Sequence, residues 1–288
     1  MFELCCTVRD CHRVLRAEGT SLRCAAGHHF DRSKDGYWTL LQPQHRKSLN
    51  AGDADVAVLA RHRWLRNGRA DGFIATLRSW IEPLPRALEK SLRRTIDLGC
   101  GDGSIAPRLF PEDASSFCGI DLSRRGLKLA ARGWPTATWV MANADRMLPV
   151  ADASVDRVVS LFGRRPIEEM YRTLCDEGHC IVAVPGEDDL IELRERMQQE
   201  GRRRKRSTAI VDQMTQCGFR CVETHDWRER VQLDREGIDD ALAMTYRGVR
   251  HSQKSRLEGV ESMETTLAAD VMLFVKPLRS SRQNRGLH

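Results

Sequence analysis

The sequence predicts an α/β protein, in which a doubly wound parallel sheet follows a small N-terminal ribbon. A β-branched and apolar run at 94–98 leads into glycines at alternate positions, as expected for a buried strand that turns tightly into a helix. Strand-like and helix-like runs then alternate, which is typical of a parallel sheet with helices on both faces. Four cysteines stand within the first 24 residues, a segment too short to form its own apolar core.

The N-terminal cysteines have the spacing of a metal site. Two pairs of potential ligands, separated by twelve residues, suit tetrahedral zinc, and four protein ligands indicate a structural rather than a catalytic ion. The neighbouring Cys5 and His29 are alternative ligands, and a set of free or buried thiols is the alternative to a metal site. The predicted zinc ligands are Cys6, Cys11, Cys24 and His28.

Composition narrows the class of protein. The 288-residue chain has a net charge of +6 and ten cysteines. It has no run near the roughly 20 apolar residues of a membrane span and does not begin like a signal peptide. We therefore expect a soluble cytoplasmic protein without membrane contact, whose cysteines are thiols or metal ligands. Residues 1–90 carry 15 Lys and Arg against 10 Asp and Glu, which suits binding of a polyanion or an ordinary solvated surface.

Two helices are expected between the ribbon and the sheet, within residues 53–92. Apolar residues keep helical spacing from Val56 to Trp64, and Gly68 ends this first helix. The second helix begins near Phe73, and two prolines at 83 and 85 mark the joint before the sheet.

From residue 93 the expected elements alternate in type. The strands are 94–98, 117–121, 138–142, 154–162 and 178–184, and the helices are 104–110, 124–132, 165–175 and 188–200. Runs at 219–227 and 270–275 would form an antiparallel closing hairpin. The basic run 202–206 is interpreted as a solvated loop, with a phosphate contact as the alternative.

The glycine-rich turn predicts a cofactor site. Glycines are needed where the backbone approaches a ligand closely or takes a positive φ. Asp121 stands 18 residues beyond Gly103, at the end of the next expected strand, where a carboxylate can accept hydrogen bonds from both hydroxyls of a ribose. The alternative to a cofactor site is an ordinary turn between a strand and a helix, in which the glycines serve only the backbone conformation.

The run from Asp97 to Gly103 resembles motif I of class I S-adenosylmethionine-dependent methyltransferases, and 142–149 and 152–159 resemble their next two segments. The resemblance implies a Rossmann-like class I methyltransferase sheet that binds S-adenosylmethionine. Asp97 would lie at the methionine end, and Asn143, usually Asp in these enzymes, would face the adenine. The implied cofactor-binding residues are Asp97, Gly99, Gly101, Gly103, Asp121, Leu122, Asn143 and Ala144.

The N-terminal third carries a more specific resemblance. Three segments resemble those of one family, the zinc-containing large-subunit rRNA (guanine-N1)-methyltransferases. They are an H-x-F-D-x-x-x-x-G-Y-x-x-L-L run from His28 to Leu41, a Gln-His-Arg turn and Gly52-Asp53. Known members modify a hairpin loop of 23S rRNA, and some are macrolide-resistance determinants. The resemblance implies a zinc-binding, RNA-contacting ribbon at 1–41, a helical connector over the cofactor pocket at 42–92, a methyltransferase domain at 93–288, and a homodimer.

Aromatic and basic side chains of this third have the chemistry that RNA loops require. Unpaired bases stack on aromatic rings, and Lys and Arg bind phosphates. The candidate RNA-binding residues are Lys34, Tyr37, Trp38, His45, Arg46 and Lys47. The alternative for the aromatic rings is that they cover the apolar face of the ribbon.

Two departures from the family pattern suggest catalytic residues. Arg164 stands where the family has a proline, and Asp189 where it has a histidine. Because guanine N1 carries a proton, we hypothesise that Asp189 accepts it and that Arg164 stabilises the charge developing on O6. No Asn/Asp-Pro-Pro-Tyr/Phe tetrad follows the 154–162 strand, which disfavours methylation of an exocyclic amine.

The expected activity is methyl transfer to a guanine of large-subunit rRNA. Two alternatives remain at this level, because a fold alone does not fix a substrate. One is a small-molecule methyltransferase of the same fold, and the other is a non-catalytic RNA-binding paralogue.

Overall fold

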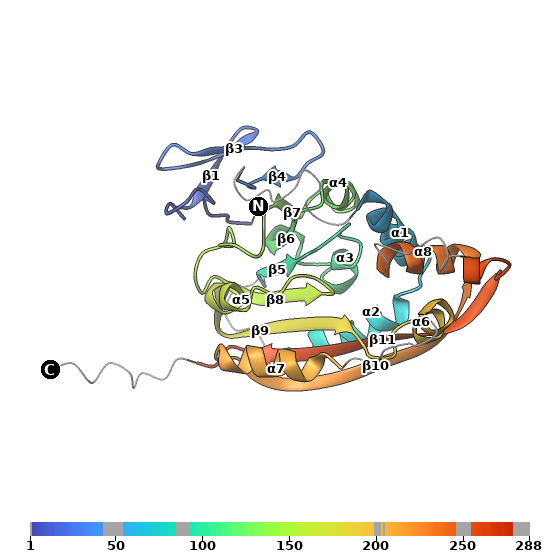
Figure 1. Ribbon diagram of the computed structural model, residues 1–288. Helices are drawn as coiled ribbons and strands as arrows, with labels where there is room; N and C mark the ends of the chain where they lie inside the picture. The colour runs from blue at the N-terminus through green and yellow to red at the C-terminus, as the bar shows by residue number, and fades with distance from the viewer. Residues whose placement is uncertain are drawn as a thin grey trace.

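An eight-stranded mixed sheet forms the centre of the molecule (Figure 1). The computed structural model describes residues 2–42, 54–84, 93–198, 203, 205–245 and 255–278. In spatial order the strands are β10 (Arg220–Asp234), β11 (Ser262–Val275), β9 (Leu174–Pro185), β8 (Val155–Leu161), β5 (Thr95–Leu98), β6 (Phe117–Asp121), β7 (Thr138–Met141) and β4 (Trp38–Thr39). Strands β4 to β9 pair in parallel, and β10 and β11 close the sheet antiparallel. The α/β prediction is therefore confirmed.

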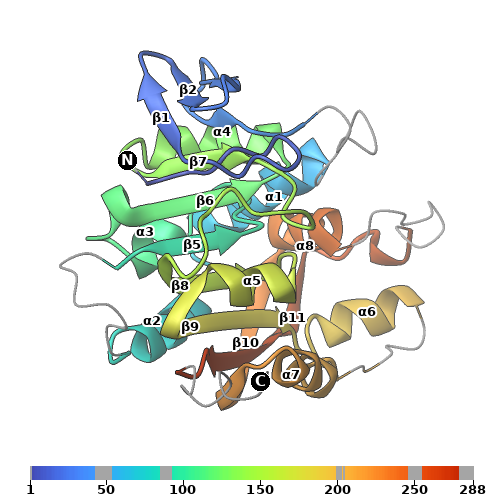
Figure 2. The same cartoon turned by 90° about the vertical axis from the view of Figure 1, so that its left-hand side faces the viewer.

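Helices cover both faces of this sheet (Figure 2). One face packs against α5 (Ile167–Thr173), α7 (Ser207–Gln216) and the N-terminal ribbon, through a core that includes Met170, Met214 and Leu22. The other face packs against α2 (Asp71–Ile81), α3 (Ala106–Leu109) and α4 (Arg124–Gly133), through Leu77 and Leu127 among others. Burial of these apolar side chains on both faces is what holds such a three-layer arrangement together.

A third apolar cluster lies beyond the carboxyl ends of the parallel strands. It joins α1 (Asp55–Arg66), α6 (Ile191–Gln198) and α8 (Arg235–Thr245) to the far ends of β10 and β11. Trp64 and Leu193 are among its buried members. The cluster faces the edge of the sheet at which the glycine-rich turn lies.

The N-terminal ribbon is a separate antiparallel sheet of β1 (Leu15–Glu18), β2 (Ser21–Cys24) and β3 (His29–Asp31). It is fixed to the large sheet, because the following β4 pairs in parallel with β7. The backbone amide of Cys5 also donates to the carbonyl oxygen of Pro149, at 2.9 Å. The ribbon and the large sheet therefore share one apolar core.

The two connector helices were predicted with nearly their observed bounds. Gly68 follows the first helix at φ 73°, a left-handed conformation that favours glycine and ends the helix. Every helix in the described ranges is too short or too polar to span a bilayer.

The C-terminal third differs most from the prediction. Strands β10 and β11 extend to residues 234 and 262, well past the expected hairpin, and α7 and α8 were not expected. Both strands continue beyond the end of β9 as a two-stranded arm, where most of the β10 side chains are exposed. Without burial on one face there is no apolar alternation in the sequence to mark the extension.

Candidate functional site

The glycine-rich turn after β5 is built on backbone conformations that side chains disfavour. Gly99, Gly101 and Gly103 have φ values of 77°, 57° and 69°. The turn also touches the end of β8, since a Cβ on Gly163 would clash with the carbonyl oxygen of Leu98. Close backbone contact of this kind keeps the edge of the sheet open for a ligand.

Asp121 lies at the end of β6, beside this turn. Its Oδ2 accepts from the amide of Gly101 at 2.8 Å, and its Oδ1 accepts from the amide of Ser123 at 2.7 Å. These bonds fix the plane of the carboxylate, and a carboxylate oxygen can accept more than one hydrogen bond. The group is therefore held ready to accept hydrogen bonds from the two hydroxyls of a ribose.

Asp97, the third residue of β5, adds a second carboxylate. Its side chain is buried, and this burial together with the charge of Asp121 raises its pKa to about 7. Two carboxylates at one edge of the sheet favour a cationic ligand. S-adenosylmethionine carries a sulfonium and an ammonium group as well as a ribose, so these residues fit it.

The remaining predicted cofactor residues follow β6, which pairs with β5, and β7, which pairs with β6. Leu122 follows Asp121 directly, and Asn143 and Ala144 follow β7. The Asn143 side chain accepts from the amide of Asp145 at 3.0 Å, and the amide of Ala142 donates to the Asp121 carbonyl oxygen at 3.2 Å. The eight predicted residues thus belong to three adjacent strand ends.

Helix α1 is tied to the glycine-rich turn by residues that the sequence did not single out. Nδ1 of His62 lies 2.6 Å from Oδ2 of Asp102, and the Ser104 hydroxyl donates to the same carboxylate. Arg61 lies close to Gly101. No local motif marks the contact of His62 with Asp102, because the two residues are 40 positions apart.

A cavity of about 530 Å³ lies beside the turn, between the ends of β8 and β9, helices α1 and α8, and the arm of β10 and β11. Its walls combine aromatic rings with four arginines and two carboxylates. These are Trp64, Phe73, Phe162, Trp227, Arg61, Arg69, Arg194, Arg206, Glu187 and Asp189. An apolar cavity with a few charged groups is a usual substrate site.

Asp189 lies in this cavity, as a catalytic role would require. Burial raises its pKa to about 6, while its Oδ1 accepts a hydrogen bond from the amide of Ala268 at 3.0 Å. A carboxylate with this pKa is ionised at neutral pH and is a better proton acceptor than an exposed one.

Arg164 does not lie in the cavity, contrary to the hypothesis for this residue. Its side chain is 75% exposed and faces Asp145 at 3.6 Å. The tight turn at Gly163 carries the chain past the cavity before Arg164 is reached. The cavity arginines come instead from other segments, among them Arg206 of the basic run that was interpreted as a solvated loop.

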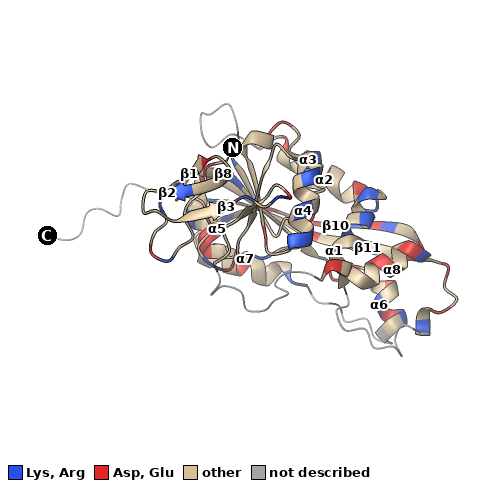
Figure 3. Cartoon of the chain, turned by 90° about the horizontal axis from the view of Figure 1, so that it is seen from above, with Lys and Arg blue, Asp and Glu red and all other residues tan. Residues whose placement is uncertain are grey.

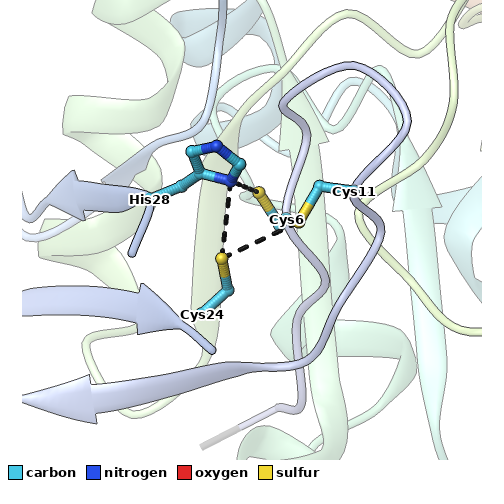
Figure 4. Close-up of side chains that lie close together, drawn as sticks. All are labelled: Cys6, Cys11, Cys24 and His28. Carbon is cyan, nitrogen blue, oxygen red and sulfur yellow. Dashed lines mark hydrogen bonds between the residues drawn. The ribbon is translucent and has the colours of Figure 1, made fainter. Parts of the chain in front are cut away.

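The four predicted zinc ligands lie together in the ribbon (Figure 4). Nδ1 of His28 is 3.4 Å from the sulfur of Cys6 and 3.5 Å from that of Cys24, and the sulfurs of Cys11 and Cys24 are 3.8 Å apart. Zinc bonds of about 2.3 Å to sulfur and 2.0–2.1 Å to nitrogen give tetrahedral edges of about this length. The Cys3His set therefore fits a structural zinc ion.

The alternative ligands are placed outside this cluster. Cys5 and His29 are not among the residues whose donor atoms lie within 4.8 Å of one another. Burial alone would raise the pKa of the Cys24 thiol, but hydrogen bonds from the amides of Ala26 and His28 and from neighbouring side chains lower it to about 7. Such amides favour the thiolate that a metal requires.

The candidate RNA-binding residues are only partly brought together. The prediction that Tyr37 and Trp38 stack on bases is wrong for this structure, because they are 7% and 6% exposed and belong to the core. Trp38 lies in β4, which pairs with β7, and the rings of Trp38 and Tyr37 belong to two different core clusters. Lys34 is exposed, and the predicted residues 45–47 lie outside the described ranges.

Comparisons with known proteins give matches for the N-terminal ribbon and for the domain that follows it. Residues 5–49 match the model described as RlmA, N-terminal, a zinc ribbon, and residues 96–182 match a methyltransferase domain. A putative methyltransferase structure from Bacillus halodurans superposes on 71% of this chain and 99% of its own, with a TM-score of 0.53 at 17% identity. The sheet, the glycine-rich turn and the paired carboxylates define a class I S-adenosylmethionine-dependent methyltransferase.

Two curated relatives indicate a more specific family within this class. A putative 23S rRNA (guanine-N(1)-)-methyltransferase of Bacillus subtilis is 31% identical over 275 residues, which are 90% of this chain and 93% of the relative. The 23S rRNA (guanine(748)-N(1))-methyltransferase of Streptomyces fradiae is 28% identical and covers 81% of this chain and 82% of its own. The chain belongs to the zinc-containing 23S rRNA (guanine-N1)-methyltransferase family.

Proposed function

We propose that this protein transfers a methyl group from S-adenosylmethionine to N1 of a guanine in a hairpin loop of large-subunit rRNA. The proposal rests on the presence, in one chain, of two parts. One is an RlmA-type ribbon with a Cys3His cluster, and the other is a methyltransferase domain with an apolar cavity that contains a few charged groups. Since this substrate is cytoplasmic, so is the proposed site of action. The implied homodimer stays a prediction.

S-adenosylmethionine, when bound, supplies the methyl group as a cationic sulfonium. Asp97 would face its methionine end and Asp121 its ribose, and the glycine-rich turn would allow its close approach to the backbone. The cavity would hold the acceptor base next to the methyl donor and exclude water.

The acceptor must lose a proton, because N1 of neutral guanine is protonated. We assign this proton to the Asp189 carboxylate, which lines the cavity and has a pKa near 6. S-adenosylmethionine would supply the methyl group, and the Asp189 carboxylate would take the proton that N1 loses and pass it to water. The cavity arginines would stabilise negative charge on O6 as the proton leaves.

The RNA backbone would lie over the ribbon and α4. Exposed Arg124, Arg125 and Arg132 make α4 basic, as Figure 3 shows, and Lys34 extends this surface into the ribbon. Asp35 joins the two elements through Lys128 at 3.1 Å and Arg132 at 3.3 Å. Such a surface binds phosphates without reading sequence.

The test is methyl transfer from radiolabelled S-adenosylmethionine to large-subunit rRNA from a strain that lacks this gene. We expect label in the RNA, and none when Asp121→Ala protein is used. Binding of the cofactor without transfer to RNA would overturn the proposal. Label in a small molecule would then indicate the alternative class.

A further inference from the structure

Phe162 is an aromatic side chain that the fold leaves exposed at the functional site. It is 47% exposed, and it is the one aromatic residue among the exposed large apolar side chains of the described ranges. It follows directly after β8 and lines the cavity. A packing role does not explain an aromatic ring with nearly half of its surface uncovered.

The backbone of Phe162 is held in an unfavourable conformation. Its φ is 59°, and Leu190, which lines the same cavity after β9, has a φ of 53°. Bulky residues rarely adopt this region, and such positions persist where the surrounding structure enforces them, often at functional sites. Here the amide of Phe162 donates to the carbonyl oxygen of Ala183 at 2.8 Å, and Gly163 is wedged against Leu98 and Gly99.

The same contacts place Phe162 next to the cofactor turn. Gly163 touches the backbone of the glycine-rich turn, and the preceding residue, Phe162, lines the cavity beside it. Phe73 from α2 supports it, with ring centroids 5.4 Å apart, and Trp227 from β10 packs on Phe73 at 5.3 Å. The three rings form one aromatic wall, of which Phe162 is the exposed member.

We propose that the ring of Phe162 stacks on the target base and fixes its edge toward the methyl donor and Asp189. This inference rests on the proposed function. A base that is modified at its Watson–Crick edge has to leave its stack, and an aromatic face replaces the lost stacking. The charged groups of the same cavity, Asp189 among them, would then face the edge of the base rather than its plane.

The decisive experiment is a double-mutant cycle between Phe162 and the target nucleotide, once the latter is mapped. The affinities of wild-type and Phe162→Ala protein are measured for two hairpin RNAs, one with the target guanine and one abasic at that position. We expect the substitution to weaken binding of the guanine RNA roughly 5- to 150-fold, the usual effect of removing one base–aromatic stack. Binding of the abasic RNA should change little.

Three further variants separate stacking from a structural role. Phe162→Tyr should keep kcat/KM within about threefold of the wild-type value, because a flat ring remains. Phe162→Leu should lower kcat/KM nearly as much as Phe162→Ala does. Val222→Ala, a substitution at a residue with 46% exposure near the start of β10, is the control and should match the wild type. Cofactor affinity and melting temperature should stay the same in all of them.

The outcomes distinguish this inference from the proposed function. Suppose that wild-type protein methylates rRNA, but that Phe162→Ala weakens binding of the guanine RNA and of the abasic RNA equally, or weakens binding of neither. Phe162 then does not stack on the base. If wild-type protein binds the cofactor and methylates no RNA, the proposed function itself fails, and the inference fails with it.

Discussion

At the scale of single residues, burial changes the chemistry of two carboxyl groups at this site. Asp97 and Asp189 have pKa values raised to about 7 and about 6, chiefly because they lie inside the protein. The first borders the cofactor turn and the second lines the neighbouring cavity. Each should therefore titrate in the range where activity is measured.

Asp189 should set the acidic limb of the pH profile. As the pH falls through about 6 the carboxylate takes up a proton and can no longer accept one from the base, so kcat/KM should fall. Asp189→Asn should lower kcat by about 100-fold or more and abolish this limb. Cofactor affinity, measured by calorimetry, is the control and should not change. Full turnover by Asp189→Asn would exclude a role as base.

Asp97 should make cofactor binding depend on pH. Its ionised form favours the cationic ligand, and with a pKa of about 7 the ionised fraction falls about eightfold from pH 7.5 to pH 6. Calorimetry should show affinity weaker by a similar factor at about pH 6. Asp97→Asn protein should bind the cofactor weakly at both pH values. Equal wild-type affinities would show that Asp97 does not titrate on binding.

The residue scale also shows what local patterns cannot predict. The glycines and Asp121 could be predicted because the turn needs them at fixed spacing in the chain. Arg206 and His62 could not, since their positions depend on contacts between distant segments. Burial of Trp38 depends on β4 pairing with β7, which nothing in its own sequence neighbourhood encodes.

At the scale of elements, helix α1 connects the N-terminal third to the site. Arg63 and Arg69 of this region pair with Asp240 and Asp234 at α8, while His62 binds the glycine-rich turn. Helix α1 thereby couples the cofactor turn to the far wall of the cavity. The two helices were predictable from periodicity, but α8 was not, because acidic residues interrupt its apolar face.

Zinc should stabilise more than the ribbon. Leu15, Leu22 and Phe30 share one core with the large sheet, so loss of the ion should lower the melting temperature of the whole chain. We expect Cys24→Ser to reduce the free energy of unfolding by about 4 kcal/mol or more and to abolish zinc binding. His29→Ala, at an exposed neighbour of the cluster, is the control and should retain zinc by elemental analysis. An unchanged melting temperature in Cys24→Ser would contradict a structural ion.

At the scale of the whole molecule, the sheet and the third apolar cluster meet around one cavity, and the ribbon, as far as the structure describes it, adds no residue to its lining. The sheet brings the cofactor turn, the third apolar cluster supplies the opposite wall, and the ribbon with α4 forms a basic surface beside them. The fold class and most elements up to β9 follow from sequence patterns. The arm of β10 and β11 was underestimated, because exposed charged side chains along β10 conceal its length.

The most direct test of the central proposal is to map the modified nucleotide. Large-subunit rRNA from a strain lacking this gene is incubated with the protein and S-adenosylmethionine, and reverse transcription and nucleoside analysis then locate and identify the product. We predict a single stop at one hairpin-loop guanine, together with N1-methylguanosine, and neither with Asp189→Asn protein. Cofactor binding without any such stop, or a methyl group on another atom, would contradict the assignment.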